Sequence, residues 1–287
     1  MQSYPFKQVD VFTKQPFMGN PVAVVIGAEK LEPATMQRIA AWTNLSETTF
    51  VLPSERADYR LRIFTPRREF AFAGHPVIGS AHAVLESGYA ATSGGVLRQE
   101  CAAGIFDLAI EESAEGRRIF VRAPGPKIAA IDAVDAMEAL AAALDTKIAA
   151  PPLRIETGPV WIVADVGSGD KVAAVVPDLN AVAQLSESLG ATGVAIFGKA
   201  DDGIAALHVR AFAPGDGIPE DPVCGSGNAA VGAYLRHTGS LSRYGSVYTA
   251  RQGMNVGHDG RISVRVTDSG IEIGGHAVTT IDGTIHQ

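Results

Sequence analysis

The sequence of 287 residues has little cysteine and no long apolar run. Its two cysteines, Cys101 and Cys224, are too few and too different in context to form a disulfide framework or a thiolate metal site. No apolar stretch approaches the roughly 20 residues that a membrane-spanning helix needs. Residues 1–10 also lack the apolar core of a signal peptide, so we expect a cytoplasmic protein without a membrane partner.

Basic charge is scarce as well. The 24 Lys and Arg residues are scattered among 31 Asp and Glu residues, which gives a net charge of −7. Binding to a phosphate backbone needs clustered basic side chains, so we expect no nucleic-acid partner. The seven histidines include no pair at the spacing that metalloproteases use, and we therefore expect no metal site.

The chain does have the length and the apolar content for two domains. Its composition, 46% hydrophobic and 19% charged, is typical of a soluble globular protein. Short β-branched segments alternate irregularly with helical ones, which predicts an α+β fold. The best linker is Ala123-Pro124-Gly125-Pro126. We place an N-terminal domain at residues 1–125 and a C-terminal domain at residues 126–279, with the segment 280–287 as a candidate to complete the first domain.

Apolar periodicity predicts the individual elements. Pro33 suits a first helical position, and apolar residues recur at helical spacing after it. We predict helices at residues 32–42, 74–86, 135–144 and 179–189, and strands at residues 6–12, 21–26, 48–52, 59–65, 160–165 and 172–176. Residues 44–47 then form a junction between a helix and a strand, and such junctions commonly face clefts.

An internal repeat links the two halves. The segments Arg62–Pro66 and Arg210–Pro214 both read Arg-x-Phe-x-Pro, lie 148 positions apart and close a predicted strand. A loop follows each, and then a helix of small residues that begins at Gly74 or Gly225. This agreement in order and length favours duplication over chance.

The two glycine-led helix starts are candidate anion sites. A helix N-terminus presents unpaired N–H groups and the positive end of the helix dipole, so such a pair is suited to binding a small carboxylate. The alternative is that the glycines only allow close helix packing. Residues 225–230 also fit the loose dinucleotide fingerprint, but Asp221 and Pro222 interrupt the strand that this motif requires, and no acidic residue closes the next strand.

Each candidate site residue has an ordinary interpretation when it is taken alone. Glu47 is explained as a surface carboxylate and His75 as a histidine of a first helical turn. Asp221 is explained as a turn residue before Pro222, and Cys224 as a small buried hydrophobe. Their convergence at two equivalent helix starts favours function, because chemistry beside a bound carboxylate commonly needs a positioned acid or base.

At these residues the chain resembles the PhzF-like family, the phenazine-biosynthesis isomerase and its relatives, which have the diaminopimelate epimerase fold. The resemblance implies two similar domains, each a curved, mostly antiparallel sheet around a central helix. It also implies one active site between the domains, no cofactor and a homodimer. The motifs that carry it are Asp10–Phe12 with Pro16–Pro21, Ser46–Thr48, Phe72–Pro76, and Glu220–Pro222 with Gly225 and Ser226.

The resemblance assigns roles residue by residue. Glu47 matches the acid/base that moves a proton between carbon atoms of the substrate, and His75, Asp221 and Ser226 match the groups around it. We expect the substrate, a small anionic carboxylate, to be bound at Ser46, Gly74, Cys224, Gly225 and Ser226. A carboxyl group suits this proton transfer only when burial raises its pKa toward neutrality, so Glu47 should be buried.

The chain departs from related epimerases and proline racemases, which use one cysteine at each helix start. Cys224 matches the second of these cysteines, but the first position is Ala73, so a two-thiol mechanism cannot operate. The dipole near Gly225 leaves a Cys224 thiolate open as an alternative to a neutral thiol. Three hypotheses stay open: an isomerase acting through Glu47, an amino-acid or hydroxyproline-type epimerase or racemase in which Cys224 acts with Glu47 or His75, and a non-catalytic binding protein.

Overall fold

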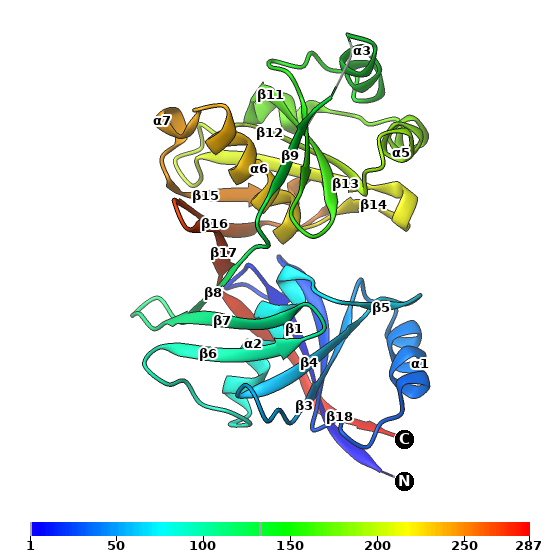
Figure 1. The fold of residues 1–287 in the computed structure, drawn as a ribbon, viewed down its shortest axis with the longest axis vertical. Helices are drawn as coiled ribbons and strands as arrows, with labels where there is room; N and C mark the ends of the chain where they lie inside the picture. Colours follow the sequence, from blue (N-terminus) through cyan, green and yellow to red (C-terminus); the bar gives the residue numbers. More distant parts are fainter. Residues whose placement is uncertain (1, 132–133) are drawn as a thin grey trace. The chain divides into compact units, whose positions relative to one another are not determined.

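The computed structural model describes residues 2–131 and 134–287 (Figure 1). The chain forms two compact units, unit 1 from Met1–Arg122 with Gly274–Gln287, and unit 2 from Ala123–Ile273. The change of unit at Ala123 falls at the Ala-Pro-Gly-Pro segment. The C-terminal part of unit 1 begins at Gly274, six residues earlier than the segment 280–287.

Unit 1 surrounds helix α2 (Gly74–Glu86) with strands (Figure 1). The helix is buried along most of its length, and a Cβ atom at Gly79 would lie 2.4 Å from a methyl carbon of Val22, so glycine is needed for this close packing. Helix α1 (Pro33–Thr43) packs Met36 and Ala40 into a cluster with residues of four strands. The strands are β1 (Ser3–Val11), β2 (Asn20–Ile26), β3 (Thr48–Leu52), β4 (Tyr59–Phe64), β5 (Glu69–Phe70), β6 (Val96–Cys101), β7 (Gly104–Glu111), β8 (Arg118–Arg122) and β18 (Ala277–His286).

Unit 2 surrounds helix α6 (Gly225–His237) in the same manner (Figure 1). Its other helices are α3 (Val134–Ala143), α4 (Gly169–Ala174), α5 (Leu179–Ser188) and α7 (Leu241–Tyr244), with short 3-10 turns at Pro214–Asp216 and Met254–Val256. Its strands are β9 (Lys127–Ala130), β10 (Leu153–Glu156), β11 (Val160–Ser168), β12 (Gly193–Lys199), β13 (Leu207–Ala213), β14 (Ile218–Asp221), β15 (Val247–Gln252), β16 (Gly260–Thr267) and β17 (Gly270–Gly275), and the chain returns to unit 1 within β17.

Strand pairing confirms the internal duplication. In unit 1, β2 pairs parallel with β3, β3 antiparallel with β4, β4 antiparallel with β5 and β4 parallel with β6. In unit 2, the pairs β11–β12, β12–β13, β13–β14 and β13–β15 have the same directions in the same order. Helices α2 and α6 both have 13 residues. The Arg-x-Phe-x-Pro repeat therefore marks a repeat of the whole topology.

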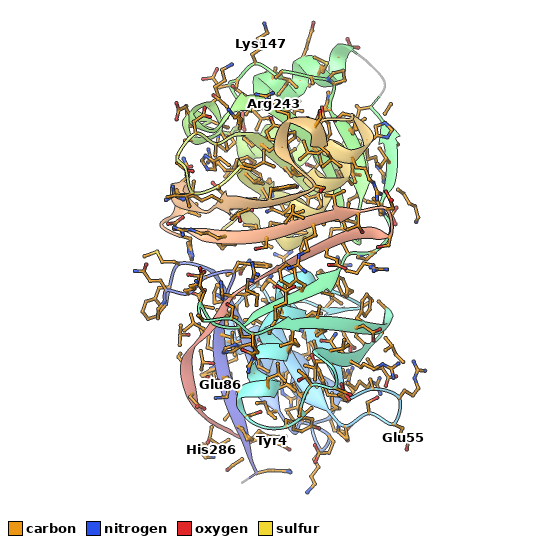
Figure 2. All side chains as sticks on the ribbon, turned by 90° about the vertical axis from the view of Figure 1, so that its left-hand side faces the viewer. Tyr4, Glu55, Glu86, Lys147, Arg243 and His286 are labelled. Atoms are coloured by element: carbon orange, nitrogen blue, oxygen red, sulfur yellow. The ribbon has the colours of Figure 1, made fainter. Side chains whose placement is uncertain are left out.

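The C-terminal strand β18 completes unit 1. It pairs antiparallel with β1 from Val11 to Ser3, and Tyr4 and His286 mark the neighbouring ends of the two strands in Figure 2. Thr279 of β18 donates a hydrogen bond of 2.6 Å to Glu86 at the end of α2. The strand thus joins both the sheet and the central helix of unit 1.

The strand predicted at residues 172–176 is wrong, because residues 169–174 form helix α4. The hydroxyl of Ser168 accepts a hydrogen bond from the N–H of Lys171 and caps this helix. Val172 and Val175 are buried in a cluster with residues of β11 and β12. Capping and core packing therefore override the β propensity of the valines.

Among the helices formed by residues 2–131 and 134–287, none has the length and apolar character needed to cross a lipid bilayer.

Candidate functional site

Glu47 is placed by the junction between α1 and β3. The helix ends at Asn44, whose left-handed conformation (φ 55°) turns the chain back toward the sheet. The backbone oxygen of Glu47 then accepts a hydrogen bond of 3.4 Å from the N–H of Ala23, beside the parallel pair β2–β3. The junction predicted at residues 44–47 therefore exists, and it directs Glu47 into a buried position.

Glu47 lies beside His75, the second residue of α2. The Nε2 atom of His75 is 3.2 Å from the Oε2 atom of Glu47, and the two side chains are 8% and 12% exposed. Burial raises the pKa of Glu47 to about 7, while the Ser46 hydroxyl opposes this rise by hydrogen bonding. The expected burial of Glu47 is confirmed, and the carboxyl group is able to gain and lose a proton near neutral pH.

The start of α2 carries no polar cap. Ala73 occupies the N-cap position, and its methyl group cannot accept a hydrogen bond from the first turn. Gly74 and His75 are both buried at this end of the helix. Unit 1 thus combines a helix N-terminus with a carboxyl group and an imidazole.

The start of α6 has different chemistry. Cys224 is the N-cap residue, and its Sγ atom accepts a hydrogen bond of 3.3 Å from the N–H of Gly227. The hydroxyl oxygen of Ser226 accepts a hydrogen bond of 3.1 Å from the indole N–H of Trp161 and lies 3.6 Å from Sγ of Cys224, to which it is hydrogen-bonded. The carbonyl oxygen of Ser226 accepts a hydrogen bond of 3.1 Å from Thr157.

The Cys224 thiol is neutral. Burial raises its pKa well above the usual value for a cysteine, and the negative charge of Asp221 adds to this effect. The hydrogen bonds from Ser226 and Gly227 act in the opposite direction but are weaker. A thiolate at the α6 start, which the sequence left open, is therefore not supported, because burial has the largest effect on the pKa.

Asp221 shapes the turn that leads into α6. It ends β14, and its Oδ1 atom accepts a hydrogen bond of 3.1 Å from the N–H of Val223. Its backbone oxygen accepts a second hydrogen bond, of 2.8 Å, from the side chain of Gln252. Asp221 thus has the turn role that its position before Pro222 predicts, at the start of α6.

The predicted site residues form two groups, each within one unit. Four neighbours in unit 2 were not predicted as site residues: Thr157, Trp161, Asn228 and Gln252. Three of them are distant in sequence from α6, and Asn228 lies in its first turns without a role that the sequence shows. Unit 1 holds Ser46, Glu47, Gly74 and His75, and unit 2 holds Asp221, Cys224, Gly225 and Ser226.

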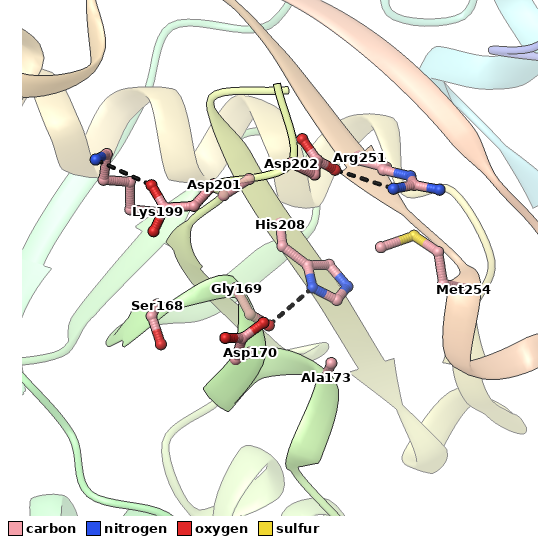
Figure 3. A pocket seen from close by; sticks show the side chains of 11 residues that line it. Ser168, Gly169, Asp170, Ala173, Lys199, Asp201, Asp202, His208, Arg251 and Met254 are labelled. Carbon is pink, nitrogen blue, oxygen red and sulfur yellow. Dashed lines mark hydrogen bonds and ion pairs between the residues drawn. The ribbon is translucent and has the colours of Figure 1, made fainter. Parts of the chain in front are cut away.

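Unit 2 also contains a pocket of about 360 Å³ that the sequence did not predict (Figure 3). Two ion pairs lie in its lining, Lys199 with Asp201 at 3.1 Å and Arg251 with Asp202 at 2.9 Å. His208 donates a hydrogen bond of 3.0 Å to the carbonyl oxygen of Gly169, and burial lowers the pKa of its imidazole. None of the predicted site residues lines this pocket.

No group of three or more His, Cys, Asp or Glu side chains in the described part of the chain is arranged to hold a metal ion.

Comparison with known proteins identifies the family. The family described as phenazine biosynthesis-like protein matches residues 9–283. The chain is 39% identical to antisense-enhancing sequence 1 of Schizosaccharomyces pombe over 99% of both chains. It is 31% identical to trans-2,3-dihydro-3-hydroxyanthranilate isomerase of Pseudomonas fluorescens, over 96% of this chain and 97% of that protein. The crystal structure of a PhzF-family protein from Bacillus anthracis matches all of both chains with a TM-score of 0.87 at 27% identity. The chain therefore belongs to the PhzF family of isomerases, with the diaminopimelate epimerase-like fold.

Proposed function

We propose that this isomerase moves a proton between two carbon atoms of a small carboxylate metabolite, with Glu47 as the acid/base. One observation carries the proposal: a buried carboxyl group with a pKa of about 7 lies 3.2 Å from an imidazole at a helix N-terminus. General acid/base catalysis is most efficient when the pKa of the group lies near the working pH.

The proposed reaction has two proton transfers. Glu47 in its carboxylate form takes a proton from a carbon atom next to a double bond, and the electrons of the broken C–H bond shift along the conjugated system. The protonated Glu47 then delivers the proton to the carbon atom at the other end of that system. The net change is a shifted double bond, which requires no oxidant and no cofactor.

His75 supports this transfer by its position. Its Nε2 atom lies near one carboxyl oxygen of Glu47, which leaves the other oxygen for the substrate. The N-terminal turn of α2 places positive dipole charge at the same place. Negative charge that develops on the substrate is stabilised by such oriented groups.

The proposed role of the α6 start is substrate binding. Gly225 and Ser226 supply backbone N–H groups, the hydroxyl group of Ser226 lies beside them, and the Cys224 thiol is neutral. Neutral donors at a helix N-terminus suit a carboxylate that must be held without being protonated. The relative from Pseudomonas fluorescens acts, by its name, on trans-2,3-dihydro-3-hydroxyanthranilate, and we propose a cyclic carboxylate of this class as the substrate.

Turnover in deuterated water tests the proposal, with trans-2,3-dihydro-3-hydroxyanthranilate as the first substrate. We expect a product with a shifted double bond and deuterium at the carbon that receives the proton. A product with inverted configuration would favour an epimerase instead. The absence of any product from a panel of cyclic carboxylates that bind the protein would favour a non-catalytic binding protein.

A further inference from the structure

Two buried amide side chains lie beneath the start of α6. Gln252, the last residue of β15, is fully buried and donates a hydrogen bond of 2.8 Å from Nε2 to the backbone oxygen of Asp221. Its Oε1 atom accepts a hydrogen bond of 2.8 Å from Nδ2 of Asn228. The same Nδ2 atom donates a second bond, of 2.9 Å, to the backbone oxygen of Cys224. The two amides therefore connect both ends of the segment 221–224.

The segment 221–224 sets the direction of the α6 start, and the chain around it is closely packed. A Cβ atom at Gly253, which follows Gln252 and has a φ of 102°, would lie 2.6 Å from the backbone oxygen of Pro222. A Cβ atom at Gly260 would lie 2.3 Å from a methyl carbon of Val223. The backbone after β15 thus fits against this turn only because these positions are glycine.

Unit 1 shows that the fold itself does not require the amides. Cys101 ends β6 as Gln252 ends β15, and Val77 is the fourth residue of α2 as Asn228 is of α6. Neither Cys101 nor Val77 can make the two amide hydrogen bonds. The duplicated scaffold folds in unit 1 without this pair, so the pair is specific to the α6 start.

We propose that Gln252 is a positioning residue for the α6 start. Through the backbone oxygen of Asp221 and the side chain of Asn228, it holds the segment 221–224 in the conformation that directs the Cys224 thiol and the N–H groups of Gly225 and Ser226. It contacts no substrate itself. The inference rests on the proposed function only for the identity of the ligand that these groups bind.

The test is the variant Gln252→Leu, which removes both hydrogen bonds at similar volume. We expect faster hydrogen exchange at the amides of residues 225–228 and a Kd for anthranilate, a stable cyclic carboxylate used as the probe, that rises about tenfold. Wherever turnover is measured, KM should rise with kcat nearly unchanged, because ground-state and transition-state binding are lost together. A variant that is only less stable would instead show a lower apparent kcat with an unchanged KM.

Gln99→Leu is the matched control. Gln99 is a fully buried glutamine of β6 that accepts a hydrogen bond of 2.9 Å from Tyr59, but it lies in unit 1. We expect Gln99→Leu to leave the anthranilate Kd and the exchange at residues 225–228 as in the wild type. Equal effects of the two variants on both readouts would overturn the proposal.

A second variant keeps the proposal testable if Gln252→Leu does not fold. Asn228→Ala removes the link to Cys224 and keeps Gln252, and alanine favours the helix. The same changes in exchange and Kd are expected, and their absence in a folded Asn228→Ala protein would overturn the proposal. If the wild type fails to bind anthranilate, the proposed substrate class is wrong, while the exchange measurements still decide whether Gln252 positions the α6 start.

Discussion

The starts of α2 and α6 occupy equivalent places in a duplicated topology but carry different functional groups. The α2 start has two titratable groups, Glu47 and His75, with their polar atoms 3.2 Å apart. The α6 start has a neutral thiol, a hydroxyl group, two buried amides and the Asp221 carboxyl group, which accepts a hydrogen bond within the turn. The duplicated scaffold thus carries different side chains in its two copies, and in the proposed function the first copy moves the proton while the second holds the ligand.

The first residue of each repeat motif, an arginine, forms the same kind of ion pair in both units. Arg62 pairs with Glu69 through two hydrogen bonds of 2.7 Å, and Arg210 pairs with Glu220 through bonds of 2.9 and 2.8 Å. Each guanidinium also lies over the phenylalanine two residues later, at 5.1 and 4.9 Å from the ring centre. The pairs differ in exposure, because the Glu69 side chain is 38% exposed and that of Glu220 is 9% exposed. The same interaction is thus at the surface in one unit and in the interior in the other.

The largest expected effect comes from Glu47→Gln. The amide keeps the shape of the side chain but cannot carry the proton, so we expect kcat to fall by at least about 100-fold. Glu55→Gln, at an exposed carboxyl group marked in Figure 2, is the control and should retain full activity. A Glu47→Gln enzyme within about tenfold of the wild type would remove Glu47 from the acid/base role.

The two arginine pairs should differ in their contribution to stability. Glu220→Gln leaves the buried charge of Arg210 without its partner, and we expect the free energy of unfolding to fall by about 3 kcal/mol. Glu69→Gln, the matched change at the exposed pair, should lower it by less than about 1 kcal/mol. Urea unfolding of both variants measures the difference, and equal losses would show that exposure does not separate the two pairs.

Stability should also depend on pH through Glu47. Its folded-state pKa of about 7 lies above the usual value of 4.5, so the folded state favours the neutral acid. The contribution of this group is fully present below pH 4.5 and is lost as the pH rises through 7. Glu47→Gln should therefore match the wild type at pH 4 and exceed its stability by about 3 kcal/mol at pH 8. A constant difference across this range would show that the pKa is not raised.

The pH dependence of activity follows from the same group. In the proposed reaction Glu47 removes a proton only in its carboxylate form, so we expect kcat/KM to rise with pH, with the midpoint of the rise near pH 7. A profile that is flat between pH 5 and pH 8 would contradict a titrating base with this pKa.

The smallest effect is expected at Cys224. Because its thiol is neutral, Cys224→Thr should change kcat/KM by less than about tenfold, well below the loss expected of an acid/base residue. A complete loss of activity in a folded variant would instead favour an epimerase in which the thiol transfers protons.

Local signals in the sequence predicted much of the fold. The start of α2 at Gly74 and the extent of β3 follow from small-residue and β-branched patterns. The strand predicted at residues 172–176 is wrong because the cap at Ser168 and the burial of two valines decide that region. Local propensity is weakest where capping and tertiary packing compete with it.

The site was predictable to a similar degree. Burial of Glu47 follows from the chemistry that its resemblance implies, and the structure bears this out. The neutral state of Cys224 did not follow, since sequence shows the helix dipole but not the depth of burial. The sequence did not indicate the pairing of Gln252 with Asn228, because their hydrogen bond joins residues 24 positions apart and depends on tertiary contact.

The closure of unit 1 by β18 has a consequence for biosynthesis. Residues 123–273 emerge from the ribosome before the strand Ala277–His286. The chain of unit 2 is therefore complete while the edge of Ser3–Val11 that pairs with this strand is still open. Such an open edge is a template for pairing between nascent chains. The segment 277–286 therefore protects an edge of the first strand from such pairing, and unit 1 is completed only after the chain of unit 2 has been made.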